Sequence, residues 1–406
     1  MQFIDLAAQQ NRIRDKIEAN IQAVLDHGKY IMGPEIKTLE SRLAEYVGVK
    51  HAIGCASGTD ALLMALLACR IGPGDAVFTT PFTFIATAEV ISLLGAVPVF
   101  VDIDSESFNI DPAKLDLAIQ AVKNNDPMIY PIPCANLNTN VPRRSSTSKD
   151  ENGHPLPITP KGVIGVDIFG LPADYERIGS VAQEHDLFVI EDAAQSFGAQ
   201  LNGTKACSFG NIACTSFFPA KPLGCYGDGG MCFTDDDELS TVMESLRVHG
   251  KGDHKYDNVR IGINGRLDSL QAGILLAKFD IFPEEIELRQ QVANRYATLL
   301  GPFSPIKVPS VPPGATSAWA QYSVLATDEP QRTELQNNLK EAGIPTAIYY
   351  PQPLHLQSAF SSLGYKKGDF PISEDCAWRI FSLPMHPYLT AEEQKNIAEV
   401  ISNSDE

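Results

Sequence analysis

Between about residues 35 and 235, stretches with helical periodicity alternate with short apolar runs rich in β-branched residues. This alternation limits the fold more than any other feature of the chain. Helical periodicity marks EIKTLESRLAEYVG, DPAKLDLAIQAV and DYERIGSVAQEHD. Other runs read as buried strands: DAVFTT, VPVFVDI, GVIGVDIFG and DLFVIED. Because alternating strands and helices form a largely parallel sheet covered by helices, we predict an α/β fold.

A second feature is the change of pattern after about residue 285, in a chain whose 406 residues exceed one ordinary core. A long helix is expected around PEEIELRQQVANRYATLL, followed by a proline-rich passage and shorter helix and strand patterns. We predict a large α/β domain over residues 1–284 and a small α+β domain over residues 285–406, joined by the long helix. Residues 131–160 are rich in Asn, Ser, Pro and charge, which favours a surface insertion over a functional lid.

The charge of the chain bears on its partners. A formal net charge of −18, with no block of Lys or Arg, argues against binding to nucleic acid or membranes. No apolar run approaches the roughly 20 residues that cross a bilayer, and the first residues lack a signal peptide's apolar stretch, so we expect a cytoplasmic protein. The eight cysteines stand singly, without a C-x-x-C pair or a nearby histidine cluster, so we expect reduced core thiols and no structural metal.

The stretch ASGTDALLMALLACRIGPGD begins with small and hydroxyl residues and continues as an apolar helix. Ser57, Gly58 and Thr59 lie at its start, where unpaired backbone N–H groups and the positive end of the helix dipole can receive a phosphate. The same residue types also cap helices that bind no ligand. On its own, this stretch therefore indicates a phosphate site or a simple helix cap.

Two further features carry acid and base groups. The strand LFVIED ends in Glu191 and Asp192, and one of these carboxylates would lie in the ligand crevice of an open α/β sheet, unless it caps a helix or forms a structural ion pair. Lys221 lies between two prolines in SFFPAKPLG, where a desolvated amine can form a Schiff base, whereas a lone loop lysine is usually solvated. A phosphate-binding helix start, a strand-end carboxylate and a constrained lysine together match the needs of pyridoxal phosphate.

The chain resembles the DegT/DnrJ/EryC1/StrS family over nearly its whole length outside residues 131–160. Six motifs carry the resemblance: HGKYIMGPEIKTLE, CASGTDAL, TPFTFIATAE, IEDAAQSFGA, TSFFPAKPLGCYGDGG and GINGRLDSLQAGIL. Family members are sugar aminotransferases with the aspartate aminotransferase fold, which is fold type I of the pyridoxal-phosphate enzymes, and they are usually homodimers. The resemblance therefore implies this fold, this cofactor and transamination of a keto sugar.

The resemblance also implies how individual residues would bind the cofactor. Lys221 would hold the cofactor aldehyde as a Schiff base, and Asp192 would contact the pyridine nitrogen. Gln195 would lie beside the phenolic oxygen. The phosphate would be bound by Gly58, Thr59 and Ser216.

Two more cofactor contacts follow from the same resemblance. Phe84 would stack on the cofactor ring, with Phe82 as the competing candidate two residues away. Asn264 would reach the phosphate in the neighbouring subunit, so that a homodimer shares its active sites. Related sugar dehydratases carry histidine at the position of Lys221, so the lysine here favours transamination.

The expected substrates are an amino donor, L-glutamate, and a keto nucleotide sugar. Within the family, the sequence most resembles the branch that aminates C3 of UDP-2-acetamido-2-deoxy-3-oxo-glucuronate for bacterial surface polysaccharides, including the O-antigen of lipopolysaccharide. Arg266 is the candidate partner of the sugar carboxylate, with a surface or interface ion pair as its alternative role. Tyr350 matches a substrate contact of this branch, whereas Tyr349 replaces its usual histidine. His249 is a further candidate contact.

Two other functions remain open from the sequence. One is a C4 aminotransferase that acts on a 4-keto-6-deoxy nucleotide sugar. The other is a non-catalytic regulator that senses the cofactor or a sugar through the same fold. A glutamate half-reaction would distinguish an enzyme from such a regulator, and a comparison of keto sugars would distinguish the two enzymes.

Overall fold

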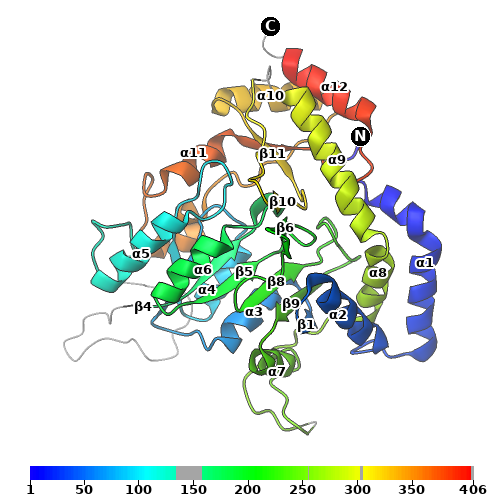
Figure 1. The fold of residues 1–406 in the computed structure, drawn as a ribbon, viewed down its shortest axis with the longest axis vertical. Helices are drawn as coiled ribbons and strands as arrows, with labels where there is room; N and C mark the ends of the chain where they lie inside the picture. Colours follow the sequence, from blue (N-terminus) through cyan, green and yellow to red (C-terminus); the bar gives the residue numbers. More distant parts are fainter. Residues whose placement is uncertain (134–157, 255, 302–304, 404–406) are drawn as a thin grey trace.

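The computed structural model describes residues 1–133, 158–254, 256–301 and 305–403. These residues build a seven-stranded sheet with helices packed around it, and the C-terminal elements form a second group at one end of the molecule (Figure 1). The α/β fold predicted from the sequence is confirmed.

The strands of the central sheet lie in the order β1-β9-β8-β5-β4-β2-β3. Neighbouring strands from β8 to β3 run parallel, whereas β9 runs antiparallel to β1 and β8. Because β9 is reversed relative to both neighbours, β1 points in the same direction as β8. The bounds are β1 His51–Cys55, β2 Asp75–Thr79, β3 Val97–Phe100, β4 Thr159–Val166, β5 Phe188–Asp192, β8 Ile212–Ser216 and β9 Gly230–Thr234.

The sequence pattern predicts β2, β3, β4 and β5. It does not predict β1, β8 and β9, which lie together at the other side of the sheet. The missed strands read HAIGC, IACTS and GMCFT. They are rich in Gly, Ala, Cys and Ser, and each has at most two β-branched or aromatic residues, which is a weak strand signal. Their positions in the sheet come from packing rather than from a local signal.

The two faces of the sheet are covered by different helices. Ala76 and Phe78 of β2 share a buried cluster with side chains of α5 and α6, whereas Val77 belongs to the cluster that contains α3 and α7. Successive side chains of a strand point to opposite faces, so both faces are core. The helices around the sheet are α1 Leu6–His27, α2 Pro34–Val47, α3 Gly58–Ala68, α4 Ala86–Leu93, α5 Pro112–Asn124, α6 Tyr175–Glu184, α7 Asp237–Leu246 and α8 Ser269–Phe279.

A second core lies among the C-terminal elements. Helix α9 (Phe282–Leu300) rises from the end of α8 toward α10 and α12 (Figure 1). Phe282 packs in the core that contains α2 and α8, whereas Val292 and Tyr296 belong to the C-terminal core. The remaining strands and α-helices are β6 Gln200–Leu201, β7 Thr204–Lys205, β10 Ala315–Thr316, β11 Tyr322–Leu325, α10 Glu329–Glu341, α11 Pro371–Arg379, β12 Ile380–Leu383 and α12 Ala391–Ser402.

Helix α9 thus connects the two cores, and the domain boundary at residues 284 and 285 stays a prediction. Not all of the chain after this boundary packs in the C-terminal core, because Leu354, Phe360 and Phe370 join the cluster of α5 and α6 on the large sheet. The second group of elements therefore contacts the sheet domain along part of its length as well as through α9.

Several expectations concern the surface and the thiols. Most of the predicted insertion, residues 134–157, lies outside the described residues. The described cysteines are free, and all of them except Cys69 are buried. Within the described part of the chain, no helix is both long and apolar enough to span a membrane, and no three His, Cys, Asp or Glu side chains are grouped as a metal site.

Candidate active site

The predicted site residues meet at one edge of the central sheet. Asp192 and Ser216 are the last residues of the parallel strands β5 and β8. Gly58 begins α3, shortly after the end of β1, which points the same way as β8. The carboxyl ends of all three strands therefore open on the same side, which is where ligands of open α/β sheets bind.

Asp192 is a buried carboxylate that is held by two hydrogen bonds. The Thr87 hydroxyl donates to Asp192 Oδ2 at 2.8 Å, and the Ala194 N–H donates to Asp192 Oδ1 at 3.2 Å. Burial raises the pKa of Asp192, while Thr87, Ala194 and the nearby charge of Lys221 oppose this rise. A cationic group in front of this carboxyl would favour its ionised form.

Lys221 stands on a tight loop between β8 and β9. Its N–H donates to the Phe218 carbonyl at 2.8 Å, and a Cβ atom on Gly224 would lie 2.5 Å from the Pro219 carbonyl oxygen. Burial lowers the pKa of the Lys221 amine, and the Asp192 carboxylate works against this shift. The constrained loop explains why this lysine lies in an apolar run, since its amine is held near Asp192 rather than in solvent.

A narrow corner lies where α3 begins. Ser57 caps the helix, and its hydroxyl accepts a hydrogen bond from the Asp60 N–H at 3.0 Å. A Cβ atom on Gly58 would lie 2.7 Å from Cβ of Ser216, closer than real Cβ contacts. Ser57 is thus the helix cap, while Gly58 and Thr59 carry the first helical N–H groups near Ser216, and their binding of a phosphate stays a prediction.

Gln195 connects the site to the C-terminal part of the chain. Its Oε1 accepts from the Phe169 N–H at 2.6 Å, and its Nε2 donates to the Tyr350 hydroxyl at 3.0 Å. The Tyr350 ring in turn lies 6.5 Å from the Phe84 ring, between centroids. Burial raises the pKa of Tyr350, so its hydroxyl stays protonated.

Burial separates the two candidate phenylalanines. Phe84 is 56% exposed, whereas Phe82 is 0% exposed and packs edge-on against Phe169 and Tyr350. A side chain that stacks on a ligand must present its face before the ligand arrives, so Phe84 is the better candidate and Phe82 is a core residue.

The candidate phosphate contact Asn264 and the candidate substrate contacts Arg266 and His249 lie on two adjacent segments. Val248 and Asn264 form a bridge, and the His249 N–H donates to the Ile263 carbonyl at 2.9 Å. Arg266 bridges Cys55, which places it beside the approach to α3. Asn264 and His249 are exposed, while the buried Nε of Arg266 has no hydrogen-bond partner among the described residues.

Tyr349 lies on the other side of the site. It is half-buried, and its ring is 6.4 Å from that of Phe3 near the N-terminus and 5.9 Å from that of Tyr350. Burial raises its pKa. The structure thus brings Tyr349 together with Tyr350, and Tyr350 is the one linked to Gln195.

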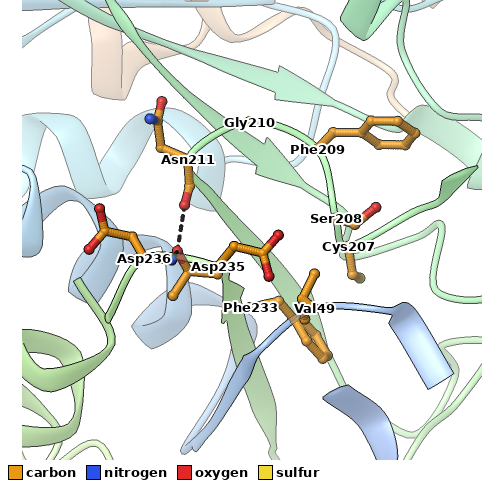
Figure 2. A pocket seen from close by; sticks show the side chains of 10 residues that line it. Val49, Cys207, Ser208, Phe209, Gly210, Asn211, Phe233, Asp235 and Asp236 are labelled. Atoms are coloured by element: carbon orange, nitrogen blue, oxygen red, sulfur yellow. Dashed lines mark hydrogen bonds between the residues drawn. The ribbon is translucent and has the colours of Figure 1, made fainter. Parts of the chain in front are cut away.

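A cavity of about 330 Å³ lies at the opposite end of β8, where the strand begins (Figure 2). None of the predicted site residues lines it. Two residues in its wall donate backbone hydrogen bonds to the Glu191 carboxylate: the Cys207 N–H at 2.6 Å and the Phe209 N–H at 2.8 Å. The lining residues are Val49, Cys207, Ser208, Phe209, Gly210, Asn211, Phe233, Thr234, Asp235 and Asp236.

These bonds decide between the two acids at the end of β5. Glu191 is fully buried, and both of its carboxylate oxygens accept hydrogen bonds from backbone N–H groups. Burial raises the pKa of Glu191 well above its ordinary value. Its neighbour Asp192 points to the other face of the sheet, where Lys221 lies. Glu191 therefore has a structural role, and Asp192 is the better candidate for the acid of the site.

Sequence reasoning missed Thr87, which orients Asp192. Thr87 lies inside the quoted motif TPFTFIATAE, in a helix that reads as apolar core. The only local sign of its role is a hydroxyl side chain in a largely apolar helix, and its hydrogen-bond partner Asp192 lies 105 residues away in the chain.

The residues present fit pyridoxal phosphate. A lysine amine and a buried carboxylate lie close enough to shift each other's pKa, and the corner between Gly58 and Ser216 would be filled by a Cβ atom. An aldehyde, a protonated pyridine nitrogen and a phosphate are the three groups that such an arrangement can hold.

Comparison with known proteins supports the same chemistry. The model of the DegT/DnrJ/EryC1/StrS aminotransferase family matches residues 11–402. The chain is 45% identical to UDP-2-acetamido-2-deoxy-3-oxo-D-glucuronate aminotransferase of Pseudomonas aeruginosa, covering 99% of this chain and 100% of the relative. It is 41% identical to the pleiotropic regulatory protein of Geobacillus stearothermophilus (98% and 97% covered) and 39% identical to UDP-N-acetyl-3-dehydro-alpha-D-glucosamine 3-aminotransferase of Acidithiobacillus ferrooxidans (98% and 96% covered).

Solved structures agree with these relatives. A DegT DnrJ EryC1 StrS aminotransferase from Brucella abortus superimposes with a TM-score of 0.89 at 46% identity, covering 99% of each chain. The protein ntda from Bacillus subtilis, with bound cofactor PMP, superimposes with a TM-score of 0.82 at 27% identity, covering 97% of this chain and 82% of that one.

Proposed function

Given that this chain belongs to the DegT/DnrJ/EryC1/StrS aminotransferase family, we propose that it transfers an amino group from L-glutamate to C3 of UDP-2-acetamido-2-deoxy-3-oxo-glucuronate. It is a pyridoxal-phosphate-dependent sugar aminotransferase. The observation that carries the proposal is that the buried Asp192 carboxylate at the end of β5, Ser216 at the end of β8 and the start of α3 meet at one edge of the sheet, where the loop with Lys221 begins. The names of the relatives from P. aeruginosa and A. ferrooxidans support a 3-oxo UDP-sugar as the acceptor.

Lys221 is the acid and base of this reaction. When bound, pyridoxal phosphate supplies an electron sink for the carbon that loses its proton. The Lys221 amine takes the proton from the α-carbon of glutamate and, in the second half of the reaction, delivers a proton to C3 of the sugar. Because burial lowers its pKa, more of the amine is neutral near pH 7 than for a solvated lysine.

The other residues hold the cofactor in place. Asp192 would keep the pyridine nitrogen protonated, with Thr87 fixing the carboxylate. Gln195 would lie beside the phenolic oxygen and Phe84 would cover the ring, as its exposure allows. The phosphate would be bound by Gly58, Thr59 and Ser216.

The sugar carboxylate is assigned to Arg266. Its Nε is buried without a partner among the described residues, and an unsatisfied guanidinium is costly until an acceptor arrives. A carboxylate accepts two parallel N–H bonds from a guanidinium, which a neutral sugar cannot match. Tyr350, Tyr349 and His249 stay candidate contacts to the rest of the substrate.

We propose that the enzyme works as a homodimer, in which Asn264 reaches the phosphate bound by the partner. Asn264 is exposed in the single chain, and Phe84, Phe218 and Ile261 also leave large apolar side chains exposed. Such exposed apolar groups are typical of surfaces that another protein covers. Free thiols in the described part of the chain support a reducing, cytoplasmic location, and the product would enter surface polysaccharide synthesis, including the O-antigen of lipopolysaccharide.

The proposal is tested with three keto sugars: the 3-oxo uronate, the 3-oxo sugar without a carboxylate, and a 4-keto-6-deoxy nucleotide sugar. With glutamate present, the uronate should give the fastest release of 2-oxoglutarate. If the 4-keto sugar is used faster, the alternative C4 aminotransferase is correct. If glutamate alone fails to convert the cofactor absorbance to the amine form, glutamate is not the amino donor.

Arg266→Gln makes the same test at the level of one residue. Loss of a charge-assisted contact should lower kcat/KM for the uronate by about 10- to 100-fold. The 3-oxo sugar without a carboxylate should be processed as before. An equal loss for both sugars would show that Arg266 has a structural role instead.

A further inference from the structure

Helix α8 holds the loop that carries Lys221 through two polar side chains. Gln271 and Lys278 are seven residues apart, or about two helical turns, so they lie on the same face of α8. Gln271 Oε1 accepts from the Tyr226 N–H at 2.9 Å, and its Nε2 donates to the Tyr226 carbonyl at 3.4 Å. The amide of Gln271 thus pairs with both polar backbone groups of one loop residue, much as a neighbouring strand would.

Lys278 makes the second attachment. Only 1% of this lysine is exposed, and its amine donates to the Gly224 carbonyl at 2.6 Å while lying 4.4 Å from the centroid of the Tyr226 ring. Glu285 and Cys225 favour its charged form, but burial outweighs them and lowers the pKa of Lys278 to about 8. Removing an ammonium from water is unfavourable, so this buried amine needs the carbonyl and the ring as substitutes for its hydration.

The attachment at Gly224 acts on Lys221 through the backbone. A Cβ atom on Gly224 would lie 2.5 Å from the Pro219 carbonyl oxygen and 2.6 Å from that of Phe218. The Phe218 carbonyl accepts the N–H of Lys221 at 2.8 Å. The peptide that Lys278 holds is therefore packed against the turn on which Lys221 stands, so a shift of one displaces the other.

We propose that Lys278 and Gln271 are positioning residues, which hold the Lys221 loop against α8 so that the Lys221 amine stays near Asp192. This inference rests on the proposed role of Lys221 in transamination. The same helix follows directly on the segment with Asn264 and Arg266, so α8 joins the proposed base to the proposed phosphate and substrate contacts.

The test uses Lys278→Met, which keeps the length of the side chain and removes the donor, and Gln271→Leu, which removes both loop contacts. Lys37→Met is the matched control, since Lys37 is an exposed lysine on α2, a helix that packs against α8. In the holoenzyme, both variants should lose about 10- to 100-fold in kcat with little change in KM for glutamate, because a misplaced base slows the chemical step. Lys37→Met should match the wild type.

A second readout needs no activity. In cofactor-free protein, Lys221 is labelled with an amine reagent across a pH series and followed by peptide mapping. The wild-type amine should react at lower pH than the Lys278→Met and Gln271→Leu amines, whose looser loop lets water reach Lys221. Unchanged kcat together with unchanged labelling in both variants would overturn the proposal.

The two readouts also separate this inference from the proposed function. If the wild type fails to transaminate but its Lys221 labelling still depends on Lys278, the function is wrong and the positioning stands. Should Lys278→Met not fold, Gln271→Glu decides, because it keeps the acceptor for the Tyr226 N–H and should retain more activity than Gln271→Leu. Equal activity of Gln271→Glu, Gln271→Leu and wild type would contradict the proposal.

Discussion

The Thr87 hydroxyl donates a hydrogen bond of 2.8 Å to the Asp192 carboxylate, across a sequence separation of 105 residues. Both side chains are buried. Thr87 lies in α4 and Asp192 ends β5, so a helix on one side of the crevice orients the acid on the other. The bond favours the ionised carboxylate and opposes the rise in pKa that burial causes.

Thr87→Val should therefore weaken cofactor binding. Valine keeps the shape of threonine but leaves the ionised Asp192 with one donor fewer, and a bond to a charged group contributes about 1.5–3 kcal/mol. We expect the dissociation constant of pyridoxal phosphate to rise about 10-fold, measured by fluorescence titration. Thr79→Val is the control, since the Thr79 hydroxyl donates to the Ile164 carbonyl at 3.0 Å instead. A similar loss in both variants would mean that the effect is not specific to Asp192.

Gly58→Ala should interfere with phosphate binding. Its Cβ atom would lie 2.7 Å from Cβ of Ser216, so the start of α3 must move away from the end of β8. Affinity should fall for pyridoxal phosphate and hold for pyridoxal, which lacks the phosphate. Gly179→Ala is the matched control, because its Cβ atom would meet nothing within 4 Å in the middle of α6, and it should stabilise the protein by about 1 kcal/mol. A loss of pyridoxal affinity equal to that of the phosphate ester would contradict a phosphate role.

The two phenylalanines of FTFIAT should respond in opposite ways. Phe84→Ala removes a side chain that is 56% exposed, so cofactor affinity should fall while the free energy of unfolding changes little. Phe82→Ala removes a fully buried ring and should cost about 3–5 kcal/mol of stability. Denaturant unfolding and cofactor titration of both variants measure the two effects. Should Phe82→Ala lose cofactor affinity without losing stability, the assignment of the two residues would be reversed.

Lys278 should make the stability of the fold depend on pH. Burial lowers its pKa from 10.5 to about 8, so between these values the unfolded chain binds a proton that the folded protein does not. Stability from this group therefore rises with pH across that window, and the unfavourable contribution is fully present below pH 8. Compared with Lys278→Met, the wild type should gain up to about 3 kcal/mol between pH 7 and 10, measured by denaturant unfolding. A constant difference between the two proteins over this range would refute the expected shift.

Candidate site residues could be predicted where a local pattern carries their chemistry, but the pattern alone could not decide between close neighbours. Lys221 and Asp192 stand out because a charge in an apolar run is unusual. The choices between Glu191 and Asp192 and between Phe82 and Phe84 depend on which face of the sheet or turn each side chain occupies, and adjacent residues share the same local composition. Only the folded chain shows that Glu191 binds the backbone of residues 207 to 209.

Two other residues were beyond the reach of local reasoning. Thr87 reads as part of an apolar helix, and its partner is far away in the chain. Lys278 lies near the end of a helix, where a lysine normally faces water and interacts with the helix dipole. Its burial goes with its contacts to Gly224, which lies 54 residues away in the chain, and to Tyr226, and could not be read from its neighbours in sequence.

Because Glu191 and Asp192 lie on opposite faces of β5, the register of this strand decides which of the two acids faces the crevice. If β5 paired with its neighbours one residue out of step, the longer acid would occupy the crevice and the shorter one would fail to reach the segment before β8. A chain with β5 misaligned in this way should bind pyridoxal phosphate poorly. Cofactor binding therefore depends on the register of β5 as well as on the identity of its two acids.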